Sequence, residues 1–289
     1  MPTTLRCEPR LFEKDLKGQV MIVTGANSGC GLETSRQLAK QGAIVILACR
    51  STEKGEAAAT DVGGVFIAPL DLGSLDSVRE FVKIFLEKYD RLDVLVNNAG
   101  IMACPFVKTK DGFEMQIGCN HLAHFLLMRL LTPLLLKTAD TSGKPSRFVA
   151  LSSAAASEST LRPGYAEIDF DDLMWEKKEY NEGGEYQQSK LANYLHAIQY
   201  SNLDAHVFKR MFGDNVISKF VGEVFRKVVL LKGDMAGHRI PYILMNVRTG
   251  EEKRIVHAQK LRHRREKHGS THSSSPTPAV ACMSSQVRQ

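Results

Sequence analysis

Tyr186 and Lys190 stand four residues apart, a spacing that places both side chains on one face of a helix. A phenol near its usual pKa of about 10 is a poor acid–base catalyst at neutral pH. An ammonium beside the phenol favours the phenolate and moves its pKa toward the working range. The pair therefore predicts a proton-transfer site.

A glycine-rich turn lies far upstream of this pair, between the apolar run 20–23 and a helical pattern over 32–41. Gly25 permits a tight turn, and Gly29 and Gly31 let the backbone approach a pyrophosphate at the helix N-terminus. An isolated glycine turn is often only loop punctuation, but a strand before it and a helix after it favour a dinucleotide site. The expected cofactor contacts are Gly25, Asn27, Ser28, Gly29, Cys30 and Gly31.

The end of the second apolar run, 43–48, indicates which nicotinamide cofactor binds. An acidic residue there would bind the ribose 2′-hydroxyl of NAD(H), whereas Arg50 occupies this place. A guanidinium suits a 2′-phosphate, so NADP(H) is favoured over the alternative of a solvated surface arginine. Asp71, followed by Leu72 after the third apolar run, is expected either at the adenine or as a helix N-cap.

Five apolar runs of strand length alternate with helical patterns. The runs are 20–23, 43–48, 65–68, 92–96 and 147–151, and the helices are expected over 32–41, 75–88, 112–137 and 184–201. Strands without polar alternation, separated by helices, predict an α/β fold with a doubly wound, Rossmann-like parallel sheet.

Polar residues near the ends of the later strands are further candidates. Asn98, Ala99 and Gly100 follow the fourth run, at the edge where ligands bind in such sheets. Asn120 lies inside a predicted helix, where asparagine is neutral to unfavourable, so it is either a surface residue or part of a proton relay. Ser153 ends the fifth strand as either a turn or a catalytic serine. Two histidines beside Asn120 lack a third ligand for a metal, and no metal is expected.

These motifs together resemble the short-chain dehydrogenase/reductase family, most closely its retinol-dehydrogenase-like reductases. The stretches that carry the resemblance are 24–31, 48–50, 97–100, 120–127 and 186–193. The resemblance implies that Tyr186 exchanges the proton with the substrate oxygen and that Lys190 lowers the phenol pKa and holds the nicotinamide ribose. It also implies that Ser153 steadies the substrate oxygen and that Asn120 holds a water linking Lys190 to solvent. Relatives often form homodimers through the helices that correspond here to 112–137 and 184–201.

The chain departs from the family after the helix that carries Tyr186. A sixth strand and a Pro-Gly turn are expected there, yet Ser201 runs directly into 202–206, which contain neither. We interpret this junction as an internal deletion that leaves the sheet without its last strands. The predicted organisation is an N-terminal arm (1–17), a Rossmann-like domain (18–237) and a basic tail (238–289), with a helix over 216–231 and disorder from about 250.

Composition narrows the function classes. The net charge is +6, and +5 of it lies in residues 251–289, so the body of the chain is nearly neutral. The basic tail lacks interleaved aromatic residues, and no nucleic-acid partner is expected. The six cysteines form no CxxC pair, and neither a signal peptide nor an apolar run of membrane-spanning length is recognised, which favours the cytoplasm. Two hypotheses remain: an NADP(H)-dependent enzyme acting on an apolar alcohol, aldehyde or ketone, and a weak or inactive nucleotide-binding isoform.

Overall fold

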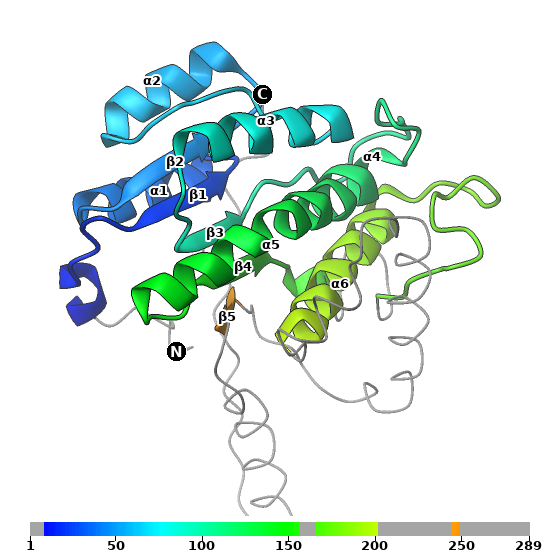
Figure 1. The fold of residues 1–289 in the computed structure, drawn as a ribbon. Helices are drawn as coiled ribbons and strands as arrows, with labels where there is room; N and C mark the ends of the chain where they lie inside the picture. The colour runs from blue at the N-terminus through cyan, green and yellow to red at the C-terminus, as the bar shows by residue number, and fades with distance from the viewer. Residues whose placement is uncertain (1–8, 157–165, 202–243, 249–289) are drawn as a thin grey trace, which may run out of the picture. The chain divides into compact units, whose positions relative to one another are not determined.

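The computed structural model describes residues 9–156, 166–201 and 244–248 (Figure 1). The chain divides into two compact units, one formed by Leu16–Glu251 and one by Met1–Asp15 with Glu252–Gln289. In the latter unit only residues 9–15 are described, and they include a 3₁₀ turn at Pro9–Glu13 (η1). The larger unit carries the sheet and the predicted site.

The sheet of the larger unit has the strand order β2-β1-β3-β4-β5. Four of these strands run parallel, and β5 pairs antiparallel with β4. The strands are β1 (Val20–Thr24), β2 (Ile44–Ala48), β3 (Val94–Asn97), β4 (Arg147–Leu151) and β5 (Leu244–Arg248). The strand order reverses at β1, as in a doubly wound fold, and this confirms the predicted fold class.

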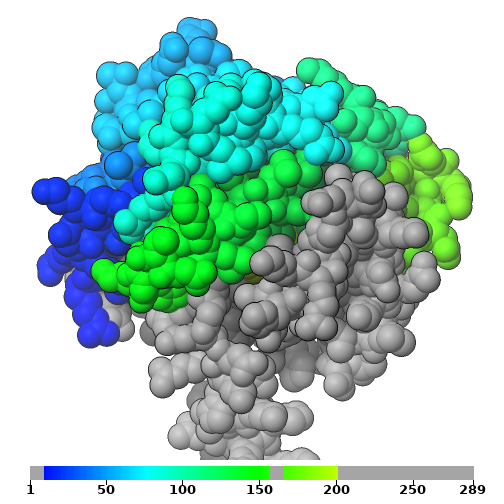
Figure 2. Space-filling view, in the orientation of Figure 1, coloured from blue at the N-terminus to red at the C-terminus, as the bar shows by residue number. Residues whose placement is uncertain are grey.

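Helices cover both faces of the sheet (Figure 1). On one face lie α1 (Gly29–Lys40) and α2 (Thr52–Val62); on the other lie α3 (Leu75–Lys88), α5 (Ala123–Ser142) and α6 (Glu182–Ser201). Figure 2 shows α3 in cyan and α5 in green packed side by side on the second face. Among the described residues, three short elements complete this unit: α4 (Met115–Ile117), the π-helical turn η2 (Gly118–Leu122) and the 3₁₀ turn η3 (Ala154–Ala156).

Alternate residues of the buried strands enter two separate cores. Met21 and Val23 of β1 pack with the helices α1 and α2, whereas Val20 and Ile22 pack with α3, α5 and α6. This two-sided burial explains why β1 and β2 read as continuous apolar runs rather than as alternating ones.

The third predicted strand, 65–68, is wrong as a strand. Only Val65 forms an isolated parallel bridge, with Ile46 of β2, and the chain then leaves the sheet before Pro69. Backbone contact resumes only after Pro69, where the N–H of Leu70 donates to the Cys49 carbonyl oxygen (2.9 Å), so this segment adds no regular strand at the outer edge. Helix α2 was not predicted, because its alanine-rich stretch has a weak apolar periodicity.

The helix predicted over 112–137 is shifted and interrupted. Gly112 adopts a left-handed backbone (φ 84°), and helical structure starts at Met115, widens into a π-helical turn at Gly118–Leu122 (η2) and continues to Ser142. Among the described residues, Met115–Ser142 is the one helical run long and apolar enough to cross a membrane. Its most apolar stretch is 56% buried inside the protein, and a core helix meets the same criteria.

The deletion interpretation predicted that the sheet ends at β4. The structure instead adds a further strand beside β4. Residues Leu244–Arg248, placed by prediction in a tail without core elements, pair with the whole of β4 from Leu151 to Arg147. The physical reason is that β4 offers a row of unpaired backbone groups, and the run 243–247 is rich in residues that favour strands. The Ser201–Asn202 junction, the helix predicted over 216–231 and the tail beyond 248 lie outside the described residues.

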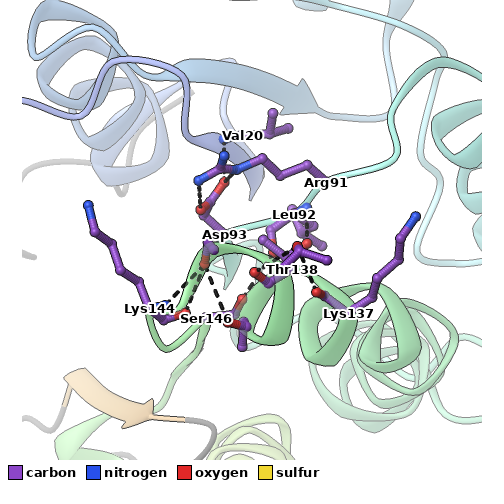
Figure 3. Close-up of polar contacts among 11 residues, drawn as sticks. Val20, Arg91, Leu92, Asp93, Lys137, Thr138, Lys144 and Ser146 are labelled. Atoms are coloured by element: carbon purple, nitrogen blue, oxygen red, sulfur yellow. Dashed lines mark hydrogen bonds and ion pairs between the residues drawn. The ribbon is translucent and has the colours of Figure 1, made fainter.

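A charged cluster joins the amino-terminal ends of two central strands, at the opposite end of the strands from the predicted site (Figure 3). The Asp93 carboxylate accepts hydrogen bonds from the backbone N–H of Val20 (2.8 Å) and from both sides of the Arg91 guanidinium (2.7 Å each). Thr138 of α5 accepts a hydrogen bond from the N–H of Leu92 (2.9 Å). One carboxylate therefore joins the starts of β1 and β3, with α5 held beside them.

Replacing Asp93 by alanine is expected to destabilise the fold without touching the site. The substitution leaves the N–H of Val20 without its partner and removes a bidentate ion pair, a loss of about 2–3 kcal/mol. Thermal or urea unfolding measures it, with Asp90→Ala, an exposed neighbour, as the control. Equal stability of the two variants would contradict the role assigned to Asp93.

Candidate active site

The glycine turn joins β1 to α1 as predicted, and its geometry requires glycine. Gly25 and Gly29 have left-handed backbones (φ 65° and 53°). A Cβ at Gly31 would overlap the carbonyl oxygen of Gly25 and lie 2.5 Å from the Asn98 amide nitrogen. Ser28 precedes α1 as its N-cap, yet its side chain makes no capping hydrogen bond. The N–H groups of the first helical turn are therefore available to an anion such as a pyrophosphate.

The Thr24 hydroxyl, fully buried at the end of β1, connects this turn to the next strand. It accepts hydrogen bonds from the backbone N–H groups of Asn98 and Ala99, both at 2.9 Å. The Asn98 side chain donates to the Thr24 carbonyl oxygen (2.8 Å). Gly100 follows, and a Cβ there would lie 3.2 Å from the Lys190 ammonium. The structure thus brings Asn98, Ala99 and Gly100 between the glycine turn and Lys190.

His124 continues the Thr24 connection into the helix that carries Asn120. Its Nδ1 lies 3.1 Å from the Asn120 carbonyl oxygen, which can only accept, so Nδ1 carries the hydrogen. Burial lowers the pKa of His124 to about 4, so the ring is neutral and its Nε2 accepts from the Thr24 hydroxyl (2.9 Å). His124 is thus a buried hydrogen-bonding residue.

Asn120 lies in the π-helical turn, and its side chain forms three hydrogen bonds with two residues. Its amide oxygen accepts from the N–H of Ile101 (2.8 Å), and its amide nitrogen donates to the Ile101 carbonyl oxygen (2.9 Å) and to Ser189 Oγ (3.0 Å). A Cβ at Gly100 would lie 3.3 Å from this amide oxygen, so Asn120 and Lys190 border the same glycine. The surface alternative for Asn120 is wrong, and its water-holding role stays a prediction.

Tyr186 and Lys190 lie on α6, and both side chains are buried (6% and 3% exposed). The Lys190 ammonium lies 5.6 Å from the centre of the Tyr186 ring and donates to the Leu151 carbonyl oxygen (3.3 Å) at the end of β4. Burial lowers the pKa of Lys190 to about 8, which leaves the ammonium charged at neutral pH. The ammonium lies beside the phenol ring, as the spacing of the two residues predicted. Its stabilisation of a phenolate stays a prediction.

Ser153 follows β4 by two residues, and Ser152 beside it has a different task. Ser153 Oγ accepts from the N–H of Ala155 (3.2 Å), which shapes the turn at η3. Ser152 donates to the Lys190 carbonyl oxygen (2.7 Å) and so attaches α6 to the end of β4. Ser153 thus serves as a turn serine in this structure, and its catalytic role stays a prediction.

Of the remaining predicted cofactor residues, Arg50 follows strand β2, whereas Asp71 and Leu72 follow a segment that forms no strand. Arg50 is exposed after β2, while the Ser51 hydroxyl caps α2 by accepting from the N–H of Lys54 (3.3 Å). Asp71 is half-buried and accepts from the N–H of Gly73 (3.0 Å); Leu72 lies between them. The N-cap of α3 is Ser74, so the capping alternative for Asp71 is wrong.

Sequence reasoning missed three residues that hold the site: Thr24, Ser189 and Asn193. Asn193 donates to the carbonyl oxygens of Asn120 (3.0 Å) and Leu151 (3.2 Å) and receives the Nδ1 hydrogen of His121 (3.0 Å). Most of these partners lie about 70 or more residues away, and Leu151 lies 42 residues from Asn193, so no local pattern marks them. Asn193 shares a helix face with Lys190, which is the one signal that could have pointed to it.

Comparisons with known proteins agree with this geometry. A family model for short chain dehydrogenases matches residues 19–166. Human retinol dehydrogenase 13 is 48% identical over 183 residues, covering 61% of this chain and 52% of the relative. Human retinol dehydrogenase 14 is 43% identical over 199 residues, covering 62% and 55%. The chain therefore spans about half the length of the curated relatives it matches.

Two solved structures share the fold. One is an uncharacterised protein from Mycobacterium paratuberculosis, 43% identical, with a TM-score of 0.55 over 65% of this chain and 63% of that one. The other is Pseudomonas aeruginosa RhlG in an active-site complex with NADP, 25% identical, with a TM-score of 0.50 over 65% of this chain and 67% of that one.

The buried histidines beside the site predict acid lability. Burial lowers the pKa of His121 and His124 to about 4 and that of His196 to about 3. Each unfolded imidazole takes up a proton below a pH of about 6.5, and the folded one does so only near its lowered pKa. Stability is therefore lost as the pH falls from about 6.5 to 4, by up to about 2 kcal/mol per histidine at pH 5.

Melting temperatures between pH 7.5 and 5 measure this effect. His196→Leu should flatten the pH dependence, because it removes one of the buried imidazoles. The variant should keep the fold, because the His196 Nε2 has no hydrogen-bond partner among the described residues and the ring contributes mainly packing. A wild-type melting temperature that does not change over this range would refute the assignment of neutral imidazoles.

Proposed function

The chain belongs to the short chain dehydrogenase family, and from this premise we propose that it is an NADP(H)-dependent oxidoreductase that interconverts an alcohol and a carbonyl group on an apolar small molecule. The observation that carries the proposal is the buried Lys190 ammonium, 5.6 Å from the Tyr186 ring and bordering Gly100 beside the nucleotide turn. In this proposal, proton transfer and nucleotide binding would meet at the carboxyl ends of β1, β3 and β4.

The residues of the glycine turn fit a dinucleotide cofactor. The close approach at Gly31 and the uncapped first turn of α1 suit a pyrophosphate, and Asn98, Ala99 and Gly100 suit the nicotinamide end. When bound, the cofactor would donate or accept the hydride. Lys190 would hold its ribose through the ammonium that now contacts Leu151.

The chain itself would handle the proton. Tyr186 would donate it to the carbonyl oxygen in reduction and accept it from the hydroxyl in oxidation. Lys190 would lower the pKa of the phenol through its charge, and Ser153 would steady the substrate oxygen by a hydrogen bond. Asn120 would hold a water beside Lys190, which completes the proposed relay to solvent.

Three observations support the finer points of cofactor and substrate. Arg50 lies exposed after β2, at the position where an acidic residue would favour NAD(H). The structure of RhlG is a complex with NADP. The named relatives are retinol dehydrogenases, whose name indicates an apolar alcohol. Met102, Phe106 and Val107, in the loop after Gly100, are exposed apolar side chains that suit a retinoid-like molecule or a lipid aldehyde.

An active enzyme is favoured over a weak or inactive isoform, because Asn120, Tyr186 and Lys190 are all present and buried together. We further propose a cytoplasmic location, a homodimer through α5 and α6, and no nucleic-acid partner. The cytoplasmic location is supported by cysteines that form no CxxC pair, and the homodimer by the long apolar helix α5. The nearly neutral body of the chain argues against a nucleic-acid partner.

NADPH should bind at least about tenfold more tightly than NADH, since one charge-assisted contact contributes about 1.5–3 kcal/mol. Arg50→Asp should reverse this order by repelling the 2′-phosphate and accepting from a ribose hydroxyl. Fluorescence titration of both proteins with both cofactors gives the affinities, and Lys54→Asp on the exposed first turn of α2 is the control. Equal affinity of the wild-type protein for the two cofactors would rule out the role of Arg50.

Tyr186→Phe should remove nearly all reduction of an apolar aldehyde and leave NADPH binding almost unchanged, because only the proton donor is lost. Tyr194→Phe, on the same helix, should keep the activity and serves as the matched control. NADPH oxidation at 340 nm with retinal or a long-chain aldehyde measures turnover. A Tyr186→Phe protein as active as wild type would show that the proton comes from another group.

A further inference from the structure

Two glutamates are fully buried beside the start of α6. Glu114 immediately precedes α4, Glu185 lies in the first turn of α6, and both are 0% exposed. The proton transfer proposed above uses neither of them. Because a buried carboxyl group is costly unless its charge is removed or its oxygens are hydrogen-bonded, the pair needs an explanation.

The Glu114 carboxylate acts only as an acceptor. One oxygen accepts from the backbone N–H groups of Gln116 (2.8 Å) and Ile117 (2.9 Å), and so caps the start of α4. The other accepts from the Tyr180 hydroxyl (2.8 Å). Three donors thus point at the Glu114 carboxyl group, which accepts from all of them.

The Glu185 carboxyl group has the opposite character. Its Oε2 accepts from the Gln188 side chain (2.6 Å), and its Oε1 accepts from no described residue, as expected for the oxygen that carries a proton. Burial, and then the neighbouring charge of Glu114, raise the pKa of Glu185 to about 10. Lys178 acts weakly in the other direction. Glu185 is therefore neutral, and Glu114 is the acceptor beside it.

The other ionisable groups around the pair are the Tyr180 phenol, the Cys104 thiol, the exposed Glu182 carboxylate and the Lys178 ammonium. The Tyr180 hydroxyl, which also contacts the carbonyl oxygen of Cys104 (3.2 Å), has its pKa raised by burial. The pKa of the Cys104 thiol is raised by burial and by the charges of Glu114 and Glu182. Both stay neutral at pH 7, so Lys178 is the one cation acting on Glu185 from the described residues.

The two glutamates join three segments to the catalytic helix. Gln188, hydrogen-bonded to Glu185, also accepts from the N–H of Asp169 (2.9 Å) and donates to the Leu173 carbonyl oxygen (3.0 Å). Gln116, capped by Glu114, accepts from the N–H of Ala103 (2.9 Å) in the loop that follows Gly100. Gln116 also donates to the Glu182 carbonyl oxygen in the first turn of α6 (2.9 Å). The start of α6 is thus connected to the segments 101–104, 114–117 and 169–173, and Tyr186 is the next residue after Glu185.

We propose that Glu114 and Glu185 form a carboxyl–carboxylate clamp holding one proton, and that this clamp positions the first turn of α6 and with it Tyr186. Glu185 is a positioning residue that acts through the helix. The clamp stands on the burial of both side chains and on the hydrogen bond between them, and its consequence for turnover rests on the proposed function.

The proton of the clamp can be tested without any substrate. A carboxyl group whose pKa is higher in the folded than in the unfolded protein destabilises the fold increasingly as the pH rises from about 4.3 toward the folded value. Glu185→Gln keeps a hydrogen-bond donor toward Glu114 and cannot ionise. Its melting temperature should exceed that of the wild type by an amount that grows by several degrees from pH 5 to pH 9.

Glu182→Gln is the matched control, because Glu182 is exposed in the same helical turn. Its difference from wild type should stay constant over this pH range. A constant difference for Glu185→Gln would overturn the one-proton clamp.

The positioning role needs a variant without the donor, Glu185→Leu. Emission of Trp175, the single tryptophan of the chain, reports whether the variant keeps the segment beside Tyr180 packed. The phenol pKa of Tyr186 is then measured from the tyrosinate absorbance difference between each protein and its Tyr186→Phe counterpart. We expect the Gln variant to keep the wild-type pKa and the Leu variant to raise it, with a loss of kcat of tenfold or more and little change in KM.

A folded Leu variant with the wild-type phenol pKa and kcat would overturn the positioning role. If no protein in the set turns over an aldehyde, the proposed function fails, whereas the melting and absorbance results still decide the clamp.

Discussion

The hydroxyl of Thr24 is the junction on which the site depends. It accepts the N–H groups of Asn98 and Ala99 and donates to Nε2 of His124, whose opposite nitrogen donates to the Asn120 carbonyl oxygen. The hydroxyl thus uses its acceptor and donor capacity at once, away from water. Through it the glycine turn, the end of β3 and the π-helical turn form one hydrogen-bonded unit, so the nucleotide cradle and the proton-transfer residues cannot shift independently.

This junction works because the fold separates stability from chemistry along the strands. At one edge of the sheet, Asp93 and Arg91 fix the starts of β1 and β3 with charge (Figure 3). At the other edge, the strands end in small and polar residues whose backbones remain close to one another, as at Gly25 and Ala99. Parallel strands bring all their carboxyl ends to this second edge, where the order reverses at β1 and leaves room for a ligand.

The parts predicted from sequence are those written in local patterns. Tyr186 and Lys190 are one helical turn apart, and the glycine turn lies between a strand and a helix, so their geometry could be stated before the structure was known. The roles of Thr24 and Asn193 depend on partners 42 to 100 positions away, and no pattern in one sequence records such contacts. Glu114 and Glu185 were missed for a further reason: a charged residue is expected at the surface, and only the fold shows both of them buried. The pairing of β5 with β4 is likewise non-local.

The π-helical turn at Gly118–Leu122 sets the direction in which the side chains on either side of it point. Each residue of an α-helix turns the chain by about 100°, so the wider turn rotates everything after it relative to everything before it. Here that rotation lets Asn120 address Ile101 and Ser189 while His124, four residues later, addresses Thr24. A lineage that lost one residue from this turn would keep a continuous apolar helix and lose the alignment between the two ends of the site. The length of this segment, more than its composition, therefore keeps the two ends of the site aligned.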